Sequence, residues 1–107
     1  MRDTTKLLQD ILAAISTIES YGVSSYEAFL GDEKTQGAIM FNLIIMGEAA
    51  NRISDEYKEN HSEIPWSSII GTRNVIVHGY DQVKLQIVWD IINKNLQPLK
   101  KSLMKLA

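Results

Sequence analysis

The chain has 107 residues, room for one domain and too few for two, so we expect a single domain over residues 1–107. Hydrophobic residues make up 45% and charged residues 22%, which excludes a disordered chain, and the net charge of −2 excludes a protein that coats nucleic acid nonspecifically. The chain has no Cys and no run of the ~18 apolar residues that a membrane span needs, so we expect a cytoplasmic protein with no membrane partner.

The first half of the chain carries two helical patterns. Apolar residues at three- and four-residue steps predict an amphipathic helix over Thr4–Tyr21. Ser24 and Glu27 have the spacing of a capping box, which predicts a short turn of helix after it. No proline interrupts residues 32–59, so we expect one long helix there, buried along its apolar part, Ala38–Ala50.

The next segment contains a proline and a glycine that favour two short helices. Pro65 suits the first turn of a helix whose apolar face ends at Gly71. Thr72 can cap a second helix that continues to about residue 79. The β-branched run Val75–Val77 resembles a strand, but it has no partner of similar pattern elsewhere, so we predict a helix.

The last segment repeats leucine and other apolar residues at helical spacing, with Pro98 inside the pattern. Because proline cannot donate a helical hydrogen bond, we expect a kink or a break near Asn95–Gln97. With no alternating pattern for a sheet, the chain is predicted to be an all-α bundle of four or five helices. The apolar excess of Ala38–Ala50 is more than one small bundle easily covers, which predicts a homodimer.

Few residues offer chemistry. The zinc motifs HExxH and CxxC, the GxSxG elbow and the Walker loop are all missing from the sequence. His61 and His78 are its two histidines, and neither has a second histidine or a carboxylate pair at ligand spacing. We therefore predict no metal site and no cofactor, and we interpret His61, in a polar stretch, as a solvated loop residue.

His78 differs because Arg73 and Tyr80 lie close to it in the sequence. Arg, His and Tyr within eight residues can bind, protonate and position a phosphate group, although an Arg and a His that merely cap a helix end are a structural alternative. Glu48, in the apolar central helix, needs a partner, and Arg73 or Arg52 would supply it as a structural ion pair.

Arg73, His78 and Tyr80 reproduce an Arg, four residues, His, any residue, Tyr motif. With its surroundings this motif resembles that of the HEPN-domain ribonuclease toxins of the HepT type, a family of small all-α dimers. Lys84 departs from the resemblance, because many relatives carry an acidic residue there, but it removes no motif residue. The resemblance covers essentially the whole chain, through Met1–Asp3, Lys34–Gln36, Gly47–Ala50, Ile64–Trp66, Ile69, Gly71, Arg73–Asn74, His78–Tyr80 and Ile87–Trp89.

The resemblance implies a homodimeric HEPN-type bundle of four to five helices that cleaves RNA with Arg73 and His78. It also implies a minimal nucleotidyltransferase antitoxin that attaches AMP to Tyr80, which would place a negative phosphate and a bulky base where RNA phosphate must lie. Tyr80 could in addition donate a hydrogen bond to RNA. Asn74 could hydrogen-bond phosphate or hold Arg73, and a purely structural role for an asparagine at a helix N-terminus is the open alternative.

Such cleavage requires no metal, because the RNA 2′-hydroxyl is itself the nucleophile. An imidazole can accept its proton or protonate the departing 5′-oxygen, so His78 suits either step. Arg73 offers a planar fork of donors to the transition state, in which charge grows on the nonbridging oxygens. The expected products are a 2′,3′-cyclic phosphate and a 5′-hydroxyl.

Helical geometry separates Arg73 from His78. A five-residue step turns by ~500° and leaves the two side chains about 140° apart, so one helix cannot aim both at one phosphate. Either His78 lies at a frayed end beside Gly79, or a second subunit completes the cleft, and the resemblance implies the second. If the helix continues, Tyr80 returns to within ~20° of Arg73 and borders the same groove.

We therefore predict a homodimeric, metal-independent endoribonuclease, the toxin half of a prokaryotic toxin-antitoxin pair. The rival hypothesis is a noncatalytic substrate-binding or adaptor subunit of a nucleotidyltransferase, which would hold a nucleotide phosphate with Arg73 and would not need His78. A third hypothesis is an interaction bundle in which the motif is inert.

Overall fold

The computed structural model describes residues 3–107, so the part of the resemblance at Met1 and Arg2 lies outside the described residues. The described residues form helices and no strand, as predicted for an all-α fold. The helices are α1 (Thr4–Ser20), α2 (Tyr26–Leu30), α3 (Glu33–Arg52), α4 (Asp55–Asn60), α5 (Trp66–His78), a 3-10 turn (Tyr80–Gln82), α6 (Leu85–Asp90), a π-helical turn (Ile91–Asn95) and α7 (Leu96–Met104).

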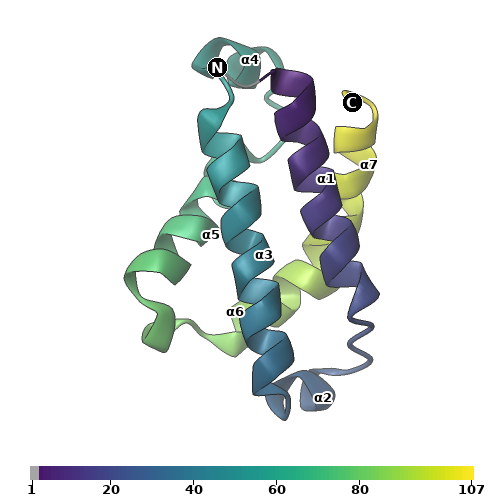
Figure 1. The fold of residues 1–107 in the computed structure, drawn as a ribbon, viewed down its shortest axis with the longest axis vertical. Coiled ribbons are helices and arrows are strands. Elements are labelled where there is room, and N and C mark those ends of the chain that lie inside the picture. Colours follow the sequence, from purple (N-terminus) through teal and green to yellow (C-terminus); the bar gives the residue numbers. More distant parts are fainter. Residues whose placement is uncertain (1–2) are drawn as a thin grey trace.

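Helix α3 is the centre of the bundle, as its apolar sequence predicts. It packs against α1 on one side and α5 on the other, and α7 lies along α1 (Figure 1). The short helix α2 covers one end through Phe29, which is fully buried and whose ring lies 6.0 Å from that of Trp89 in α6. The largest fully buried side chains of the core are Phe29, Leu7, Leu8, Ile11, Ile15, Ile39, Ile64, Ile76, Leu103 and Val88.

The expected single helix over residues 32–59 is wrong, because the chain breaks between α3 and α4. Ile53 has extended backbone angles and is buried, and the Ser54 hydroxyl accepts a hydrogen bond from the Tyr57 amide at 3.2 Å. Lys58 then donates to the carbonyl oxygen of Ala50 at 3.1 Å, which satisfies the end of α3. A serine cap and the burial of Ile53 together outweigh continuation of the helix.

The caps of α2 and α3 come from the residue immediately before each helix. The Ser25 hydroxyl accepts from the Ala28 amide at 3.1 Å, so the capping residue is Ser25 and the prediction of Ser24 is wrong by one position. Asp32 caps α3, where its carboxylate accepts from the hydroxyl and the amide of Thr35. These hydrogen bonds, the hydroxyl's first, lower the pKa of the Asp32 carboxyl.

Helix α5 is one continuous helix, so the predicted interruption at Gly71 is wrong. The Thr72 hydroxyl donates to the carbonyl oxygen of Ser68 at 2.8 Å and caps nothing. A single glycine costs a helix only about 1 kcal/mol, which packing of α5 on α3 can outweigh. Val75–Val77 are helical, as predicted.

Pro98 does disturb the last helix, as predicted, although the disturbance begins earlier. The five residues before α7 form the π-helical turn, and Pro98 is the third residue of α7. Proline has no N–H for the carbonyl four residues before it, and the wider turn accommodates the missing bond. In the described part of the chain, no helix combines the length and the apolar character needed to cross a bilayer.

Candidate active site

Arg73 lies where α5 crosses α3. Its Nε and Nη2 both donate to Oε1 of Glu48, at 3.0 and 2.6 Å, and its Nη1 donates to Oδ1 of Asn74 at 2.8 Å. The predicted pairing of Glu48 with an arginine is confirmed, and Asn74 holds Arg73, one of the roles predicted for it. Both members of the ion pair are partly exposed, at 27% for Arg73 and 42% for Glu48.

Gly47 makes this crossing possible. A Cβ atom placed on Gly47 would lie 2.1 Å from Cβ of Arg73 and 3.1 Å from the carbonyl oxygen of Ile69. The first contact is closer than Cβ atoms tolerate and the second is tight, so only glycine fits between α3 and α5 here without a shift of the helices. No contact at Gly47 was predicted from the sequence, although a glycine inside an otherwise apolar helix is a signal of close packing.

The guanidinium of Arg73 keeps part of its donor capacity. Of its five N–H groups, one Nε–H and one Nη2–H go to Glu48 and one Nη1–H goes to Asn74. One N–H therefore remains on each terminal nitrogen. Arg73 can therefore still donate to phosphate oxygens without leaving Glu48.

His78 is the last residue of α5 and is exposed. Within residues 3–107 its side chain forms no hydrogen bond, and the Gly79 amide ends the helix by donating to the carbonyl oxygen of Val75 at 2.9 Å. Arg73 faces α3 while His78, five positions on, points about 140° away on the same helix. One chain therefore does not bring Arg73 and His78 to one phosphate.

Tyr80 does not continue the helix, so the expectation that it returns beside Arg73 is wrong. It begins the 3-10 turn after Gly79 and is 59% exposed. Its hydroxyl lies against α3, 3.8 Å from where a Cβ of Gly37 would stand. Gly37 and Gly47 are ten residues apart, which is about 15 Å along a helix, so Tyr80 and Arg73 contact α3 at separate places.

His61 lies at the opposite end of α5 from His78, because its carbonyl oxygen accepts from Nε1 of Trp66, the first residue of that helix. Its ring packs 4.2 Å from that of Tyr57, and Nδ1 is 3.6 Å from Glu63. The prediction of a freely solvated loop residue is therefore too simple. Residues 3–107 contain no group of three His, Asp or Glu side chains placed to hold a metal ion.

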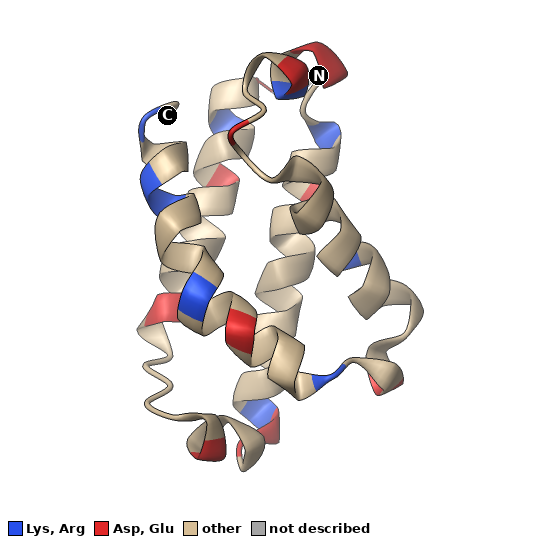
Figure 2. Cartoon of the chain, turned by 180° about the vertical axis from the view of Figure 1, so that it is seen from behind, with Lys and Arg blue, Asp and Glu red and all other residues tan. Residues whose placement is uncertain are grey.

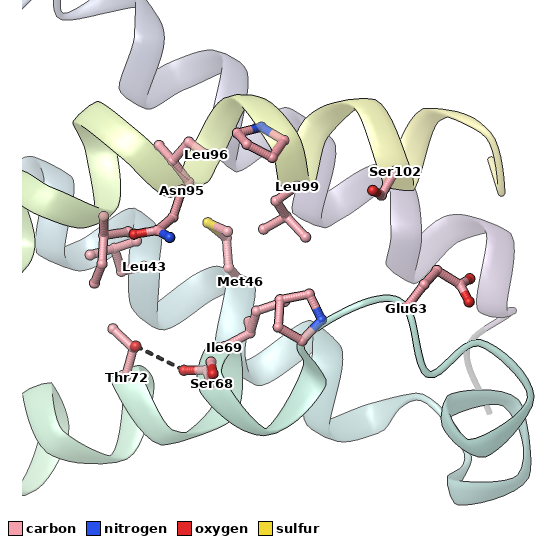
Figure 3. A pocket seen from close by; sticks show the side chains of 13 residues that line it. Leu43, Met46, Glu63, Ser68, Ile69, Thr72, Asn95, Leu96, Leu99 and Ser102 are labelled. Carbon is pink, nitrogen blue, oxygen red and sulfur yellow. Dashed lines mark hydrogen bonds between the residues drawn. The ribbon is translucent and has the colours of Figure 1, made fainter.

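A pocket of about 380 Å³ opens between α5 and α7, and it is separate from the motif. Leu43 and Met46 of α3 form its floor, while Ser68 and Thr72 of α5 face Asn95 across it (Figure 3). This pocket is not lined by Arg73, Asn74, His78 or Tyr80. The pocket therefore lies between α5 and α7, away from Arg73, Asn74 and His78 of α5 and from Tyr80 in the following turn.

The lysine and arginine positions of the described chain are spread over several separate elements (Figure 2). Two of the lysines near the C-terminus are paired with carboxylates: Lys94 lies 3.7 Å from Asp90, and Lys100 lies 2.8 Å from Glu19. This distribution agrees with the expectation that the protein does not coat nucleic acid nonspecifically, because it offers no broad positive surface for phosphates.

The protein is an all-α bundle in which Arg73 of α5 is held against the central helix α3, and His78, also on α5, is free among the described residues. These features define a class, the small helical ribonucleases of HEPN type. The family model described as "Ribonuclease HepT-like" matches residues 11–106. The chain therefore belongs to the HepT-like ribonuclease family, as the motif predicted, and is classed with enzymes that cleave RNA.

Similar proteins come from archaea and bacteria. The chain is 36% identical over 100 residues to "Probable ribonuclease HepT" of Thermococcus cleftensis, covering 92% of this chain and 91% of that protein. It is 30% identical over 101 residues to "Putative RNase MJ1380" of Methanocaldococcus jannaschii, covering 94% and 93% of the two chains. It is 34% identical over 82 residues to "Putative RNase TTE0752" of Caldanaerobacter subterraneus subsp. tengcongensis, covering 77% and 73%. No solved structure matches the chain significantly.

Replacing Gly47 tests the close approach of the two helices. Gly47→Ala should lower the free energy of unfolding by about 1–3 kcal/mol, because the new Cβ meets the Cβ of Arg73, which cannot rotate away. Gly71→Ala is the matched control, since a Cβ there meets nothing within 4 Å and alanine favours helix by up to about 1 kcal/mol. Urea unfolding measures both. Equal stability of Gly47→Ala and wild type would contradict this packing.

Proposed function

We propose that the protein is a metal-independent endoribonuclease that acts as a homodimer and as the toxin of a prokaryotic toxin-antitoxin pair, with residues 1–107 as one HEPN-type domain in the cytoplasm. The observation that carries the proposal is Arg73, held at a helix crossing with two N–H donors left for a phosphate, on the helix that ends in the free imidazole of His78. Membership of the family makes RNA the expected substrate.

In the proposed reaction the RNA 2′-oxygen attacks the adjacent phosphorus, and the bond from phosphorus to the 5′-oxygen breaks. One base removes the 2′-hydroxyl proton and one acid delivers a proton to the 5′-oxygen, so the products are a 2′,3′-cyclic phosphate and a 5′-hydroxyl. His78 takes one of these proton-transfer roles. Arg73 binds the nonbridging oxygens, where negative charge increases in the transition state. No cofactor and no metal takes part in these steps.

The homodimer is proposed because one chain leaves the site incomplete and an apolar surface uncovered. Arg73 and His78 point in different directions on α5, so a second copy has to bring its own His78 to Arg73. Phe41 lies on the same side of α3 as Glu48, and Val77 lies on the same side of α5 as Arg73. Phe41 is 62% exposed and Val77 45%, which is costly in a monomer and favourable at an interface.

The catalytic roles are tested by single substitutions. His78→Ala and Arg73→Ala should each abolish RNA cleavage while helix content and thermal midpoint change little, because neither side chain belongs to the core. Cleavage by wild type should persist in EDTA, and its products should carry 2′,3′-cyclic phosphate ends by mass spectrometry. His61→Ala is the control, because it removes the histidine at the far end of α5. Wild-type cleavage by His78→Ala would favour an adaptor instead, and inhibition by EDTA would refute the metal-free mechanism.

The shared site is tested by mixing two inactive proteins. A dimer of an Arg73→Ala chain with a His78→Ala chain contains one site with both wild-type residues and one site with neither. After random exchange half of the dimers are mixed, so about a quarter of wild-type activity should return. Each variant alone should stay inactive. A monomer by light scattering at micromolar concentration, or no recovery after verified exchange, would overturn the dimeric site.

Tyr80 is proposed as the residue that a minimal nucleotidyltransferase antitoxin modifies. Tyr80 is largely exposed, and its hydroxyl can attack the α-phosphorus of ATP, which forms the Tyr–O–P bond and releases diphosphate, while the phenolic proton goes to a base of the partner enzyme. The attached AMP adds negative charge and a bulky base to the surface between α3 and the end of α5. RNA phosphate would be repelled from that surface, so modification silences the toxin.

Tyr80→Phe tests the modification, since it removes the acceptor oxygen and keeps the exposed ring. Coexpression with the nucleotidyltransferase should raise the mass of wild type by one or more AMP units and suppress cleavage, whereas Tyr80→Phe should gain no mass and escape the antitoxin. Cleavage by purified Tyr80→Phe without antitoxin then shows whether the hydroxyl also orients RNA. AMP mapped to Tyr21, Tyr26 or Tyr57 would contradict the assignment of Tyr80.

A further inference from the structure

We propose that Glu48 is a positioning residue for the reaction. It fixes the guanidinium of Arg73 so that the two free N–H groups of Arg73 face the scissile phosphate. The inference rests on the proposed function, since it assigns Arg73 to the transition state. Its starting point is the pair of hydrogen bonds that Nε and Nη2 of Arg73 make to the same oxygen, Oε1 of Glu48.

The fold itself has little need of this ion pair. Helices α3 and α5 already pack closely on each other, and both contribute buried apolar side chains to the core, among them Leu43 of α3 and Ile69 and Ile76 of α5. An ion pair between side chains as exposed as Arg73 and Glu48 is screened by water and contributes little to stability. The ion pair therefore serves mainly to orient the guanidinium of Arg73.

Glu48 pairs with Arg73 although another arginine is nearer in sequence. Arg52 follows Glu48 by four residues, a spacing that favours an ion pair along a helix, yet Arg52 forms no ion pair or hydrogen bond among the described residues. The contact at Gly47 explains the choice, because Cβ of Arg73 rests directly on Gly47 and its side chain starts at a fixed point beside Glu48. The packing of the helices thus selects this partner.

Two bonds to one oxygen hold the Nε edge of the guanidinium, and Asn74 holds Nη1 from its own side of α5. The plane of the guanidinium is then defined by three hydrogen bonds. One N–H on each terminal nitrogen remains for the nonbridging oxygens, and donors fixed in advance cost no reorganisation during the reaction. The carboxylate also offsets part of the positive charge, so Glu48 should assist the transition state more than the binding of RNA.

The expected difference between the effect of Glu48 on the transition state and its effect on RNA binding can be tested by kinetics. Glu48→Ala should lower kcat about 10- to 100-fold, as misplacement of a reacting group does, while KM stays within about twofold of wild type or falls. Glu48→Gln, which keeps one acceptor oxygen at the same place, should retain an intermediate kcat. In a His78→Ala background, which binds RNA without cleaving it, adding Glu48→Ala should leave RNA affinity unchanged or tighter, whereas adding Arg73→Ala should weaken it.

Glu19→Ala is the matched control, because Glu19 is also a partly exposed carboxylate in an ion pair, with Lys100 at 2.8 Å between α1 and α7. It should leave kcat and KM unchanged. Where Glu48→Ala lowers the thermal midpoint strongly, the folded Glu48→Gln decides, and a wild-type kcat in that variant overturns the inference.

The two proposals fail in different ways. Cleavage that survives both Arg73→Ala and His78→Ala refutes the proposed function. Loss of cleavage in those variants, combined with a wild-type or faster kcat in Glu48→Ala, refutes only the role of Glu48 and would mean that the carboxylate masks Arg73. A rise in KM alone would likewise refute positioning, since it would place Glu48 in RNA binding.

Discussion

The contact of α5 with α3 at Gly47 is the constraint on which the candidate site depends. It brings the backbones of the two helices so close that Cβ of Arg73 rests on the glycine. The reach of the arginine side chain is thereby fixed, and Glu48, the next residue of α3, becomes its partner. A glycine inside a helix costs about 1 kcal/mol relative to alanine. Gly47 therefore lowers the intrinsic stability of α3 and allows α5 to pack closely against it.

The parts of the fold that follow from local pattern could be predicted from the sequence. The helix over Thr4–Tyr21, the buried middle of α3 and the disturbance before Pro98 all depend on residues within one or two turns of each other. The break at Ile53 and the continuity of α5 through Gly71 could not, because each depends on packing between helices that are distant in the sequence. Local propensity is too weak to decide such cases.

The candidate site divides in the same way. The sequence spacing alone identified Arg73, His78 and Tyr80 as candidate site residues. A carboxylate in an apolar helix requires a charged or hydrogen-bonding partner, which predicted a partner for Glu48. The crossing at Gly47 was missed because a sequence does not state which helices touch. The position of Tyr80 was predicted wrongly because its return beside Arg73 required a helix that ends at His78 instead.

The opening between α5 and α7 has a further consequence for motion. Helix α5 packs extensively on α3 on one side, while the pocket lies between its other side and α7. A helix supported from one side can detach locally at a free energy below that of global unfolding. Arg73 and His78 therefore belong to one segment that can loosen as a unit while α1 and α3 remain folded, and any molecule that covers α5 would slow the exchange of its amide hydrogens.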